Sequence, residues 1–238
     1  MKVVATIQAR STSARLPRKV LAPIAGRPLI YHVLDRASAI VGIDDLVVTI
    51  PHGDVDLLDT LQTYGARVCF GPEHDVLRRY LLAAEYTEAD VIVRVTADCP
   101  LLDPAAATEV LAYVRGGCDY AWNDTLTSGW PDGMDIEAFT FAALVDADRE
   151  ALRSGRDREH VTPVIRRRAR RTGYVSLRPE SLLGKVSVDT AADLERVRRI
   201  VAHLSPGDYS HAATEAAFLT ALRPSTNSPQ HVHVGVNR

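Results

Sequence analysis

The sequence predicts an α/β fold with three layers, built on a mostly parallel sheet with a small antiparallel insertion. Short runs rich in β-branched residues alternate with longer amphipathic segments through most of the 238 residues, which is typical of strand-helix-strand units. Hydrophobic residues make up 46% of the chain, enough for the core of one large domain. Charged loops follow several of the β-branched runs, at the position where open α/β sheets bind ligands.

Four strands are expected in the first part of the chain, at 3–9, 46–50, 67–70 and 91–96. The amphipathic segments between them are expected to be crossover helices whose apolar faces pack on the sheet. The first helix is expected to begin near Arg27 and Pro28, with the proline in its first turn.

The pattern changes after the helix that Asp103 is expected to cap. Short strands and turns follow over residues 119–140, around a link that contains glycine and proline. An insertion that covers the substrate is favoured here over another strand-helix-strand unit. A last strand is expected at 185–190, followed by a helix that begins with a capping box of Thr190 and Asp193.

Residues 1–222 are expected to form a single domain, whereas 223–238 have the composition of a flexible polar tail. The three cysteines are odd in number and widely spaced, which favours reduced thiols over disulfides. No stretch approaches the roughly 20 apolar residues of a membrane helix, and the first strand follows without a signal-peptide pattern. We therefore expect a cytoplasmic protein that does not bind membranes.

The formal net charge of -2 at pH 7 gives no general attraction for nucleic acid or for an anionic membrane. A polyanion must therefore bind at a local cluster of cations. The arginine-rich run 166–171 lies on an expected helix with cations on all sides and no interleaved aromatic residues. A solvated helix end is favoured there over a nucleic-acid site.

A basic loop follows the first strand. It contains four cations and three small hydroxyl residues but no acid: Arg10, Ser11, Thr12, Ser13, Arg15, Arg18 and Lys19. Such cations neutralise a polyanion, while hydroxyls and backbone N–H groups donate to phosphate oxygens. A solvated turn is the alternative, but the position after a strand favours a triphosphate cradle. No Gly-x-Gly-x-x-Gly fingerprint and no Gly-Lys-Ser/Thr loop is present, which argues against a dinucleotide oxidoreductase and a P-loop NTPase.

Two carboxylates are expected to face this loop. Asp98 follows the strand at 91–96, and Asp189 follows the run 185–188. With phosphate oxygens on the other side, the two would hold Mg²⁺. The alternative for each carboxylate is an ordinary turn or helix cap. Asp189 can be a metal ligand and also begin the following helix.

Other polar residues are candidates for contacts with a second substrate. Asp132, Asp135 and Glu137 form an alternating acidic set, in which residues 135 and 137 share one face of a strand. They are assigned to the acceptor or to a second Mg²⁺, with a solvated edge as the alternative. Arg158 and His160 are candidates for binding an acidic acceptor.

The segment that begins at Gly71 opens a helix with Asp75 in its first turn and Arg78 one turn later. Arg78 is a candidate for facing the nucleotide. An arginine on a helix more often lies along the surface, which is the alternative here.

The chain resembles the sugar-acid cytidylyltransferases, the group of the CMP-ketodeoxyoctonate and CMP-sialate synthetases, and above all their spore coat polysaccharide branch. The resemblance spans about residues 3–205 and rests on these motifs, in order: Gln8-Ala9-Arg10 with Ser13, Arg15-Leu16-Pro17 and Lys19; Gly71 with Asp75-Val76-Leu77 and Arg79-Tyr80; Thr96 with Asp98-Cys99-Pro100-Leu101; Pro131-Asp132-Gly133 with Asp135 and Glu137; Arg158-Glu159-His160-Val161-Thr162-Pro163; and Val188-Asp189-Thr190 with Asp193-Leu194. It implies a Rossmann-like sheet of the nucleotide-diphospho-sugar transferase type.

The resemblance implies that an acceptor oxygen attacks the α-phosphorus of CTP, giving a CMP-linked product and pyrophosphate. It implies catalytic roles for Arg15, Lys19 and Asp98, a Mg²⁺ site at Asp98 and Asp189, and a homodimer formed through residues 119–139. Together with the sequence patterns above, the resemblance predicts these nucleotide-binding residues: Ala9, Arg10, Ser13, Arg15, Lys19, Gly71, Asp75, Arg78 and Thr96. The acceptor-binding residues are Asp132, Asp135, Glu137, Arg158 and His160.

Two positions depart from the family pattern, which usually has glycine in place of Arg18 and often in place of Ala97. Arg18 adds bulk and charge to a loop where glycine lets the backbone approach phosphate closely. A nucleotide-binding or scaffold protein that has lost turnover is therefore the competing hypothesis. The presence of both Asp98 and Asp189 argues against it.

Overall fold

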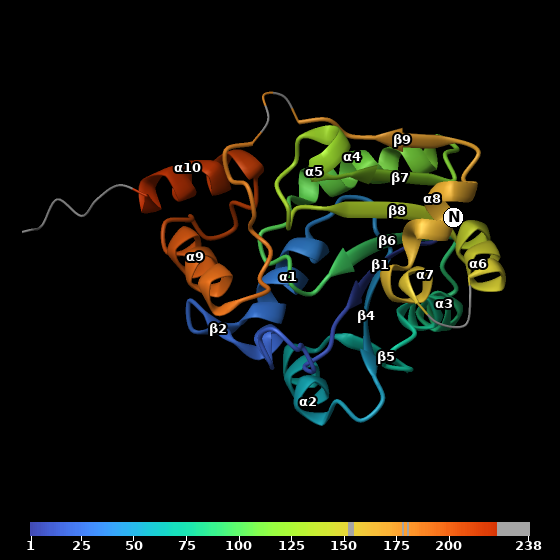
Figure 1. Ribbon diagram of the computed structural model, residues 1–238, viewed down its shortest axis with the longest axis horizontal. Coiled ribbons are helices and arrows are strands. Elements are labelled where there is room, and N and C mark those ends of the chain that lie inside the picture. The colour runs from blue at the N-terminus through green and yellow to red at the C-terminus, as the bar shows by residue number, and fades with distance from the viewer. Residues whose placement is uncertain (152–154, 178, 180, 223–238) are drawn as a thin grey trace, which may run out of the picture.

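The computed structural model describes residues 1–151, 155–177, 179 and 181–222 (Figure 1). Its main sheet has the strand order β5-β4-β1-β6-β8-β7-β9. Within the described residues, β8 is antiparallel to both neighbours and the other neighbouring pairs are parallel. The strands are β1 Val3–Gln8, β4 Asp45–Pro51, β5 Arg67–Gly71, β6 Val91–Thr96, β7 Tyr120–Asn123, β8 Ile136–Thr140 and β9 Thr172–Tyr174.

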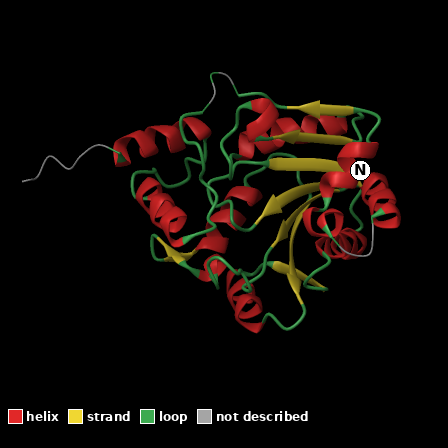
Figure 2. Ribbon diagram, viewed as in Figure 1, coloured by secondary structure: helices red, strands yellow, loops and turns green. Residues whose placement is uncertain are grey.

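Helices cover both faces of the sheet, so the predicted three-layer α/β fold is confirmed (Figure 2). One face packs against α1 Leu29–Ser38, α2 Val55–Tyr64 and α4 Pro104–Arg115. The same core continues to α9 Ala191–Val201, which packs on β2 Pro23–Ile24, and to α10 His211–Ala221, which packs on α9. The other face packs against α3 Val76–Thr87, α6 Phe141–Glu150 and α8 Thr162–Arg168, with α7 Arg156–His160 beside α3. In β1, Val3 and Ile7 enter the first core and Val4 the second, as expected for a central strand buried on both faces.

The predicted helix caps form. The Asp103 carboxylate accepts hydrogen bonds from the backbone N–H groups of Ala105 and Ala106 at the start of α4. Thr190 and Asp193 form the predicted capping box at the start of α9. These caps satisfy N–H groups that have no partner within the helix.

The predicted start of the first helix was too early. Ala25 and Gly26 both adopt left-handed φ angles, of 46° and 77°, and so turn the chain back on itself. Arg27 and Pro28 therefore pair with β2 Pro23–Ile24 as the second strand of a small hairpin, β3 Arg27–Pro28. Helix α1 begins only at Leu29.

The strand predicted at 185–190 was wrong. This segment makes a single β-bridge, between Lys185 and Asp132, and the edge position in the main sheet is taken by β9. It still lies close to the centre of the sheet, because the Val188 N–H donates to the carbonyl of Asp98 over 2.8 Å.

The antiparallel strands predicted within 119–140 are β7 and β8, and they extend the parallel sheet beyond β6 (Figure 1). The short helix α5 Thr125–Ser128 connects them. The tail predicted at 223–238 lies outside the described residues. Among the residues described, no helix has the length and apolar character needed to cross a membrane.

Candidate active site

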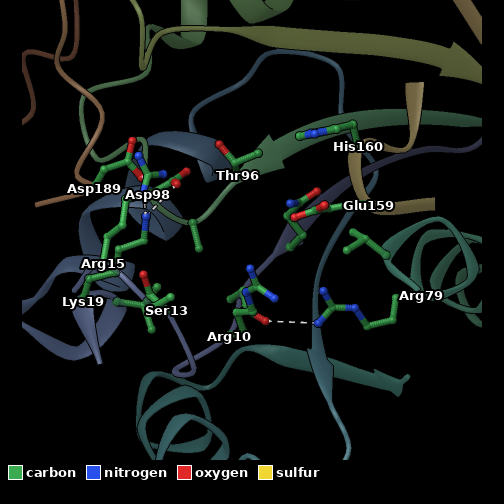
Figure 3. Close-up of a pocket in the computed structure, with 16 residues that line it drawn as sticks. Arg10, Ser13, Arg15, Lys19, Arg79, Thr96, Asp98, Glu159, His160 and Asp189 are labelled. Atoms are coloured by element: carbon green, nitrogen blue, oxygen red, sulfur yellow. Dashed lines mark hydrogen bonds and ion pairs between the residues drawn. The ribbon is translucent and has the colours of Figure 1, made fainter. Parts of the chain in front are cut away.

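A cavity of about 360 Å³ opens at the carboxyl ends of β1 and β6 (Figure 3). Gln8 and Thr96, the last residues of these strands, are paired in register, and the Ala97 N–H donates to the Gln8 carbonyl over 3.0 Å. The two strand ends therefore lie side by side. The cavity is lined by Gln8, Ala9, Arg10, Ser13, Ala14, Arg15, Lys19, Val20, Val76, Arg79, Thr96, Ala97, Asp98, Glu159, His160 and Asp189.

The basic loop is fixed by its own hydrogen bonds. The Arg18 N–H donates to the Ser11 carbonyl over 2.8 Å, which closes the loop. The backbone N–H and the hydroxyl of Ser11 donate to Asp54, at the start of α2, over 2.8 and 2.7 Å. The loop is thus ordered at both ends, and it presents Arg10, Ser13 and Arg15 to the cavity.

Lys19 joins the two predicted metal ligands. Its Nζ atom donates to Asp98 over 2.8 Å, to Asp189 over 3.0 Å and to the Val188 carbonyl over 2.7 Å. The residue is only 9% exposed, so its charge is compensated by these partners and not by water. The Lys19 ammonium therefore holds the carboxylates of Asp98 and Asp189 close to each other.

Asp189 is surrounded by cations. Besides Lys19, Arg15 donates to its carboxylate over 2.7 Å and Lys185 over 2.9 Å. Partial burial raises the pKa of Asp189, but hydrogen bonds and charge from Lys185 and Lys19 outweigh burial, and the net pKa is lowered. The carboxylate is thus ionised at neutral pH, as a metal ligand must be.

The donor chemistry of Asp98 and Asp189 fits a hard divalent cation such as Mg²⁺, which prefers carboxylate, phosphate and water oxygens. The described residues contain no cluster of three or more His, Cys, Asp or Glu side chains that could hold a metal. A cation here would therefore take its other ligands from a phosphate group and water.

The opposite wall is made by α3 and α7, which contribute Arg79, Glu159 and His160 (Figure 3). His160 was predicted for this site. Arg79 and Glu159 lie within recognised motifs but were assigned no role, and Gln8 was likewise missed. The only signal in the sequence was their position beside predicted site residues.

Four predicted residues lie outside the cavity lining: Gly71, Asp75, Arg78 and Arg158. The Arg158 guanidinium is bound by Asp75 over 2.7 Å and by Asp148 over 2.8 Å, which fixes α7 to α3 and α6. Arg78 lies at the surface with Asp148 as its nearest acid, 3.9 Å away. Gly71 lies behind the wall, against the Arg79 side chain.

The acidic set also lies outside the lining. The Glu137 carboxylate accepts from Arg94 over 2.6 Å and from the Tyr120 hydroxyl, so it is part of a partly buried network. Asp132 accepts from the Ser187 hydroxyl over 2.9 Å. Burial raises the pKa of Asp135 to about 6. The hydrogen bond that the Gly133 N–H donates to this carboxylate lowers the pKa, but by less than burial raises it.

Arg18 does not enter the cavity. It has a left-handed φ of 60°, the conformation that glycine adopts most easily, and its side chain forms an ion pair with Asp56 on α2. The cavity is therefore not filled by Arg18.

Comparison with known families agrees with this geometry. A family model described as cytidylyltransferase matches residues 4–212, which include both strand ends, the basic loop and Asp189. The chain belongs to the cytidylyltransferase family. The predicted family is thus confirmed, and the protein is a nucleotidyltransferase.

Relatives of this cytidylyltransferase are similar over most of their length. An uncharacterised protein of Methanocaldococcus jannaschii is 31% identical over 210 residues, covering 85% of this chain and 84% of its own. The 3-deoxy-manno-octulosonate cytidylyltransferase of Yersinia pseudotuberculosis is 28% identical over 254 residues, covering 84% of this chain and 99% of its own. A solved cytidylyltransferase structure from Leptospira borgpetersenii has a TM-score of 0.81 and 26% identity, over 93% of this chain and 92% of that one.

Proposed function

We propose that this cytidylyltransferase transfers CMP from CTP to an oxygen of a sugar acid, or of a related hydroxylated, phospho- or phosphono-acceptor, and releases pyrophosphate with Mg²⁺ as cofactor. The observation that carries the proposal is the meeting of Asp98 and Asp189 at Lys19, inside a cavity that also contains Arg10 and Arg15. The name of the Yersinia relative, a cytidylyltransferase for a sugar acid, supports the acceptor class.

In this proposal the basic loop binds the triphosphate. Arg15 and Lys19 are now bonded to Asp189 and Asp98, and each must exchange part of this bonding for phosphate oxygens when CTP enters. The exchange costs little, because one set of ionic hydrogen bonds replaces another. Ser13 and the backbone of Ala9 and Arg10 line the same space and complete the nucleotide site.

The reaction forms a bond between the acceptor oxygen and the α-phosphorus and breaks the bond from that phosphorus to the bridging oxygen of pyrophosphate. The acceptor's hydroxyl proton passes to solvent. Arg15 and Lys19 stabilise the charge that develops on the leaving pyrophosphate, so these residues act by position and electrostatics. Mg²⁺, when held by Asp98 and Asp189, would neutralise phosphate charge and polarise the α-phosphoryl group.

For the acceptor we propose contact with His160, which lines the cavity on α7. Arg158 positions His160 indirectly, because its ion pairs with Asp75 and Asp148 hold α7 in place. Asp132, Asp135 and Glu137 lie beyond the lining and are proposed to support the acceptor side of the site.

We also propose a cytoplasmic homodimer that associates through the region 119–139. Leu126 in this region is 93% exposed, and Trp122 and Tyr174 stack at the same edge of the sheet with ring centroids 5.7 Å apart. Sedimentation velocity tests the dimer: a clean monomer at micromolar concentration would exclude it.

The reaction is tested by incubating the purified protein with Mg²⁺, each of the four ribonucleoside triphosphates and a mixed pool of sugar acids and phosphonates. We expect pyrophosphate release with CTP and not with the other three. Tight CTP binding without release from any acceptor in the pool would favour the competing hypothesis of a protein that has lost turnover.

A further inference from the structure

The Lys19 ammonium donates to three oxygen atoms of the protein. Its Nζ atom lies 2.8 Å from the Asp98 carboxylate, 3.0 Å from the Asp189 carboxylate and 2.7 Å from the Val188 carbonyl. An ammonium has three N–H donors, so these acceptors use all of them. Lys19 also lines the cavity, where a ligand can reach it. A phosphate oxygen that binds Lys19 must therefore replace one of its present partners.

Lys19 bonds to the carboxylate oxygens that a shared metal ion would use. Oδ2 of Asp98 accepts from Lys19. In Asp189, Oδ1 accepts from Lys19 and from Arg15, over 3.0 and 2.7 Å, and Oδ2 accepts from Lys185 over 2.9 Å. Figure 3 shows Arg15, Lys19, Asp98 and Asp189 grouped on one side of the cavity. A metal ion held by both carboxylates therefore competes with Lys19 for the same oxygen atoms.

The charges around these carboxylates are balanced within the described part of the chain. Ion pairs join three carboxylates to four cations: Asp98, Asp189 and Asp193 with Arg15, Lys19, Lys185 and Arg196. Mg²⁺ gives up its water shell reluctantly, so it needs negative charge in exchange. Carboxylates that are already neutralised supply little of that charge. A triphosphate supplies it, because it brings several negative charges of its own.

We propose that Lys19 excludes divalent metal ions from this site until a nucleotide binds, an inference that rests on the proposed use of CTP and of Mg²⁺ at Asp98 and Asp189. In the free protein the ammonium is the counterion of both carboxylates. When the triphosphate enters, its oxygens accept from Lys19 and Arg15, and the carboxylate oxygens become free to bind the metal ion. Metal and nucleotide then bind cooperatively, and each strengthens the binding of the other by the same factor.

The test is titration of the nucleotide-free protein with Mn²⁺, followed by electron paramagnetic resonance, for the wild type and for Lys19→Met. Methionine keeps most of the length of the side chain and removes its charge. We expect Lys19→Met to bind Mn²⁺ at least about 10-fold more tightly than the wild type, because a positive charge within about 4 Å of the metal ion is removed. The same variant should bind CTP more weakly in calorimetric titration. A purely structural role of Lys19 would not produce these opposite effects.

Lys2→Met is the matched control. It removes the same charge, but Lys2 precedes β1 at the opposite end of that strand from the cavity. The control should keep the wild-type affinity for Mn²⁺. A second comparison adds Asp98→Asn to Lys19→Met, which should abolish the gain because one of the two carboxylates is lost. Circular dichroism establishes that each variant is folded before titration.

Mn²⁺ binding that is no tighter in folded Lys19→Met than in the wild type would overturn the inference. A gain that survives Asp98→Asn would also overturn it, because the metal ion would then bind elsewhere. Wild-type protein that binds no CTP, with or without Mn²⁺, would refute the proposed function itself. The titrations without nucleotide would still decide in that case whether Lys19 opposes metal binding.

The wild-type protein gives a reading that needs no variant, should Lys19→Met fail to fold. Mn²⁺ should not bind the free protein at the concentrations at which it strengthens CTP binding by about 10-fold or more. Binding of Mn²⁺ to the free wild-type protein at those concentrations would overturn the inference and leave the CTP site in place.

Discussion

Lys19 donates a hydrogen bond of 2.8 Å to Asp98, although 79 residues separate the two in the sequence. The bond joins the loop after β1 to the end of β6, and the same ammonium reaches Asp189 over 3.0 Å. Before substrate binds, a protein cation thus compensates two carboxylates that would otherwise repel each other. The two carboxylates are therefore already close together before a charged ligand binds.

Asp98→Asn should lower turnover by a factor of about 100 or more while the protein remains folded, because it weakens a proposed metal ligand at a loop and removes no core contact. Pyrophosphate release with CTP is the measurement, with thermal unfolding as the check on the fold. Glu150→Gln, which removes an exposed partner of Arg168, is the control and should keep wild-type turnover. Near-normal turnover in Asp98→Asn would refute the metal assignment.

Gly133→Ala should lower the free energy of unfolding by about 2–5 kcal/mol and reduce turnover. Gly133 has a φ of 101°, and an added Cβ would lie 2.2 Å from the Ser187 nitrogen, in the segment that leads to Asp189. Gly184→Ala is the control: its φ is 63° but no atom lies within 4 Å, so it should cost only about 1 kcal/mol. Urea unfolding distinguishes the two, and equal losses would show that the contact with Ser187 is unimportant.

Arg18→Gly should raise the free energy of unfolding by about 0.5–1 kcal/mol, because glycine adopts the left-handed conformation at this position without strain. The lost pair with Asp56 is exposed and contributes little. Turnover should stay within about twofold of wild type, since Arg18 does not line the cavity. A large gain in turnover would instead show that Arg18 restricts the phosphate loop.

Asp135→Asn should stabilise the protein at pH 7.5, lose most of this effect by pH 4 and lose all of it by about pH 3. Burial raises the folded-state pKa of Asp135 to about 6 from an ordinary 3.8, so ionisation destabilises the fold above pH 6. The penalty grows between pH 3.8 and 6, and it is absent only well below pH 3.8, where both the folded and the unfolded states are protonated. Melting temperatures of the two proteins over this range are the measurement, and a constant difference would contradict the raised pKa.

Short-range sequence patterns predicted the secondary structure around the site well. The strand at 91–96 and the capping box of Thr190 and Asp193 depend on neighbours in sequence, and both are confirmed. The basic loop and Asp98 meet at one cavity because the parallel strands β1 and β6 end at the same edge of the sheet. This rule needs no knowledge of side-chain packing. Asp189 reaches the cavity from an irregular segment, in which the Val188 N–H donates to the Asp98 carbonyl.

What depends on distant partners could not be predicted. The β-branched run before Asp189 has the pattern of a strand, but it lies at the carboxyl end of β6, where it makes one β-bridge to Asp132 and a hydrogen bond to the Asp98 carbonyl. Arg158 and Arg79 are both arginines on helices. Only the fold shows that the first is bound by Asp75 and Asp148, whereas the second is buried beside the cavity and forms no ion pair with any described residue.

The most direct test of a metal-dependent CTP site at Asp98 and Asp189 is calorimetric titration with CTP, with and without Mg²⁺, of wild-type protein, Asp98→Asn and Asp189→Asn. We predict that Mg²⁺ strengthens CTP binding by about 10-fold or more in the wild type and has little effect in either variant. CTP binding that is equally strong with and without Mg²⁺, or a gain that both variants retain, would contradict the account.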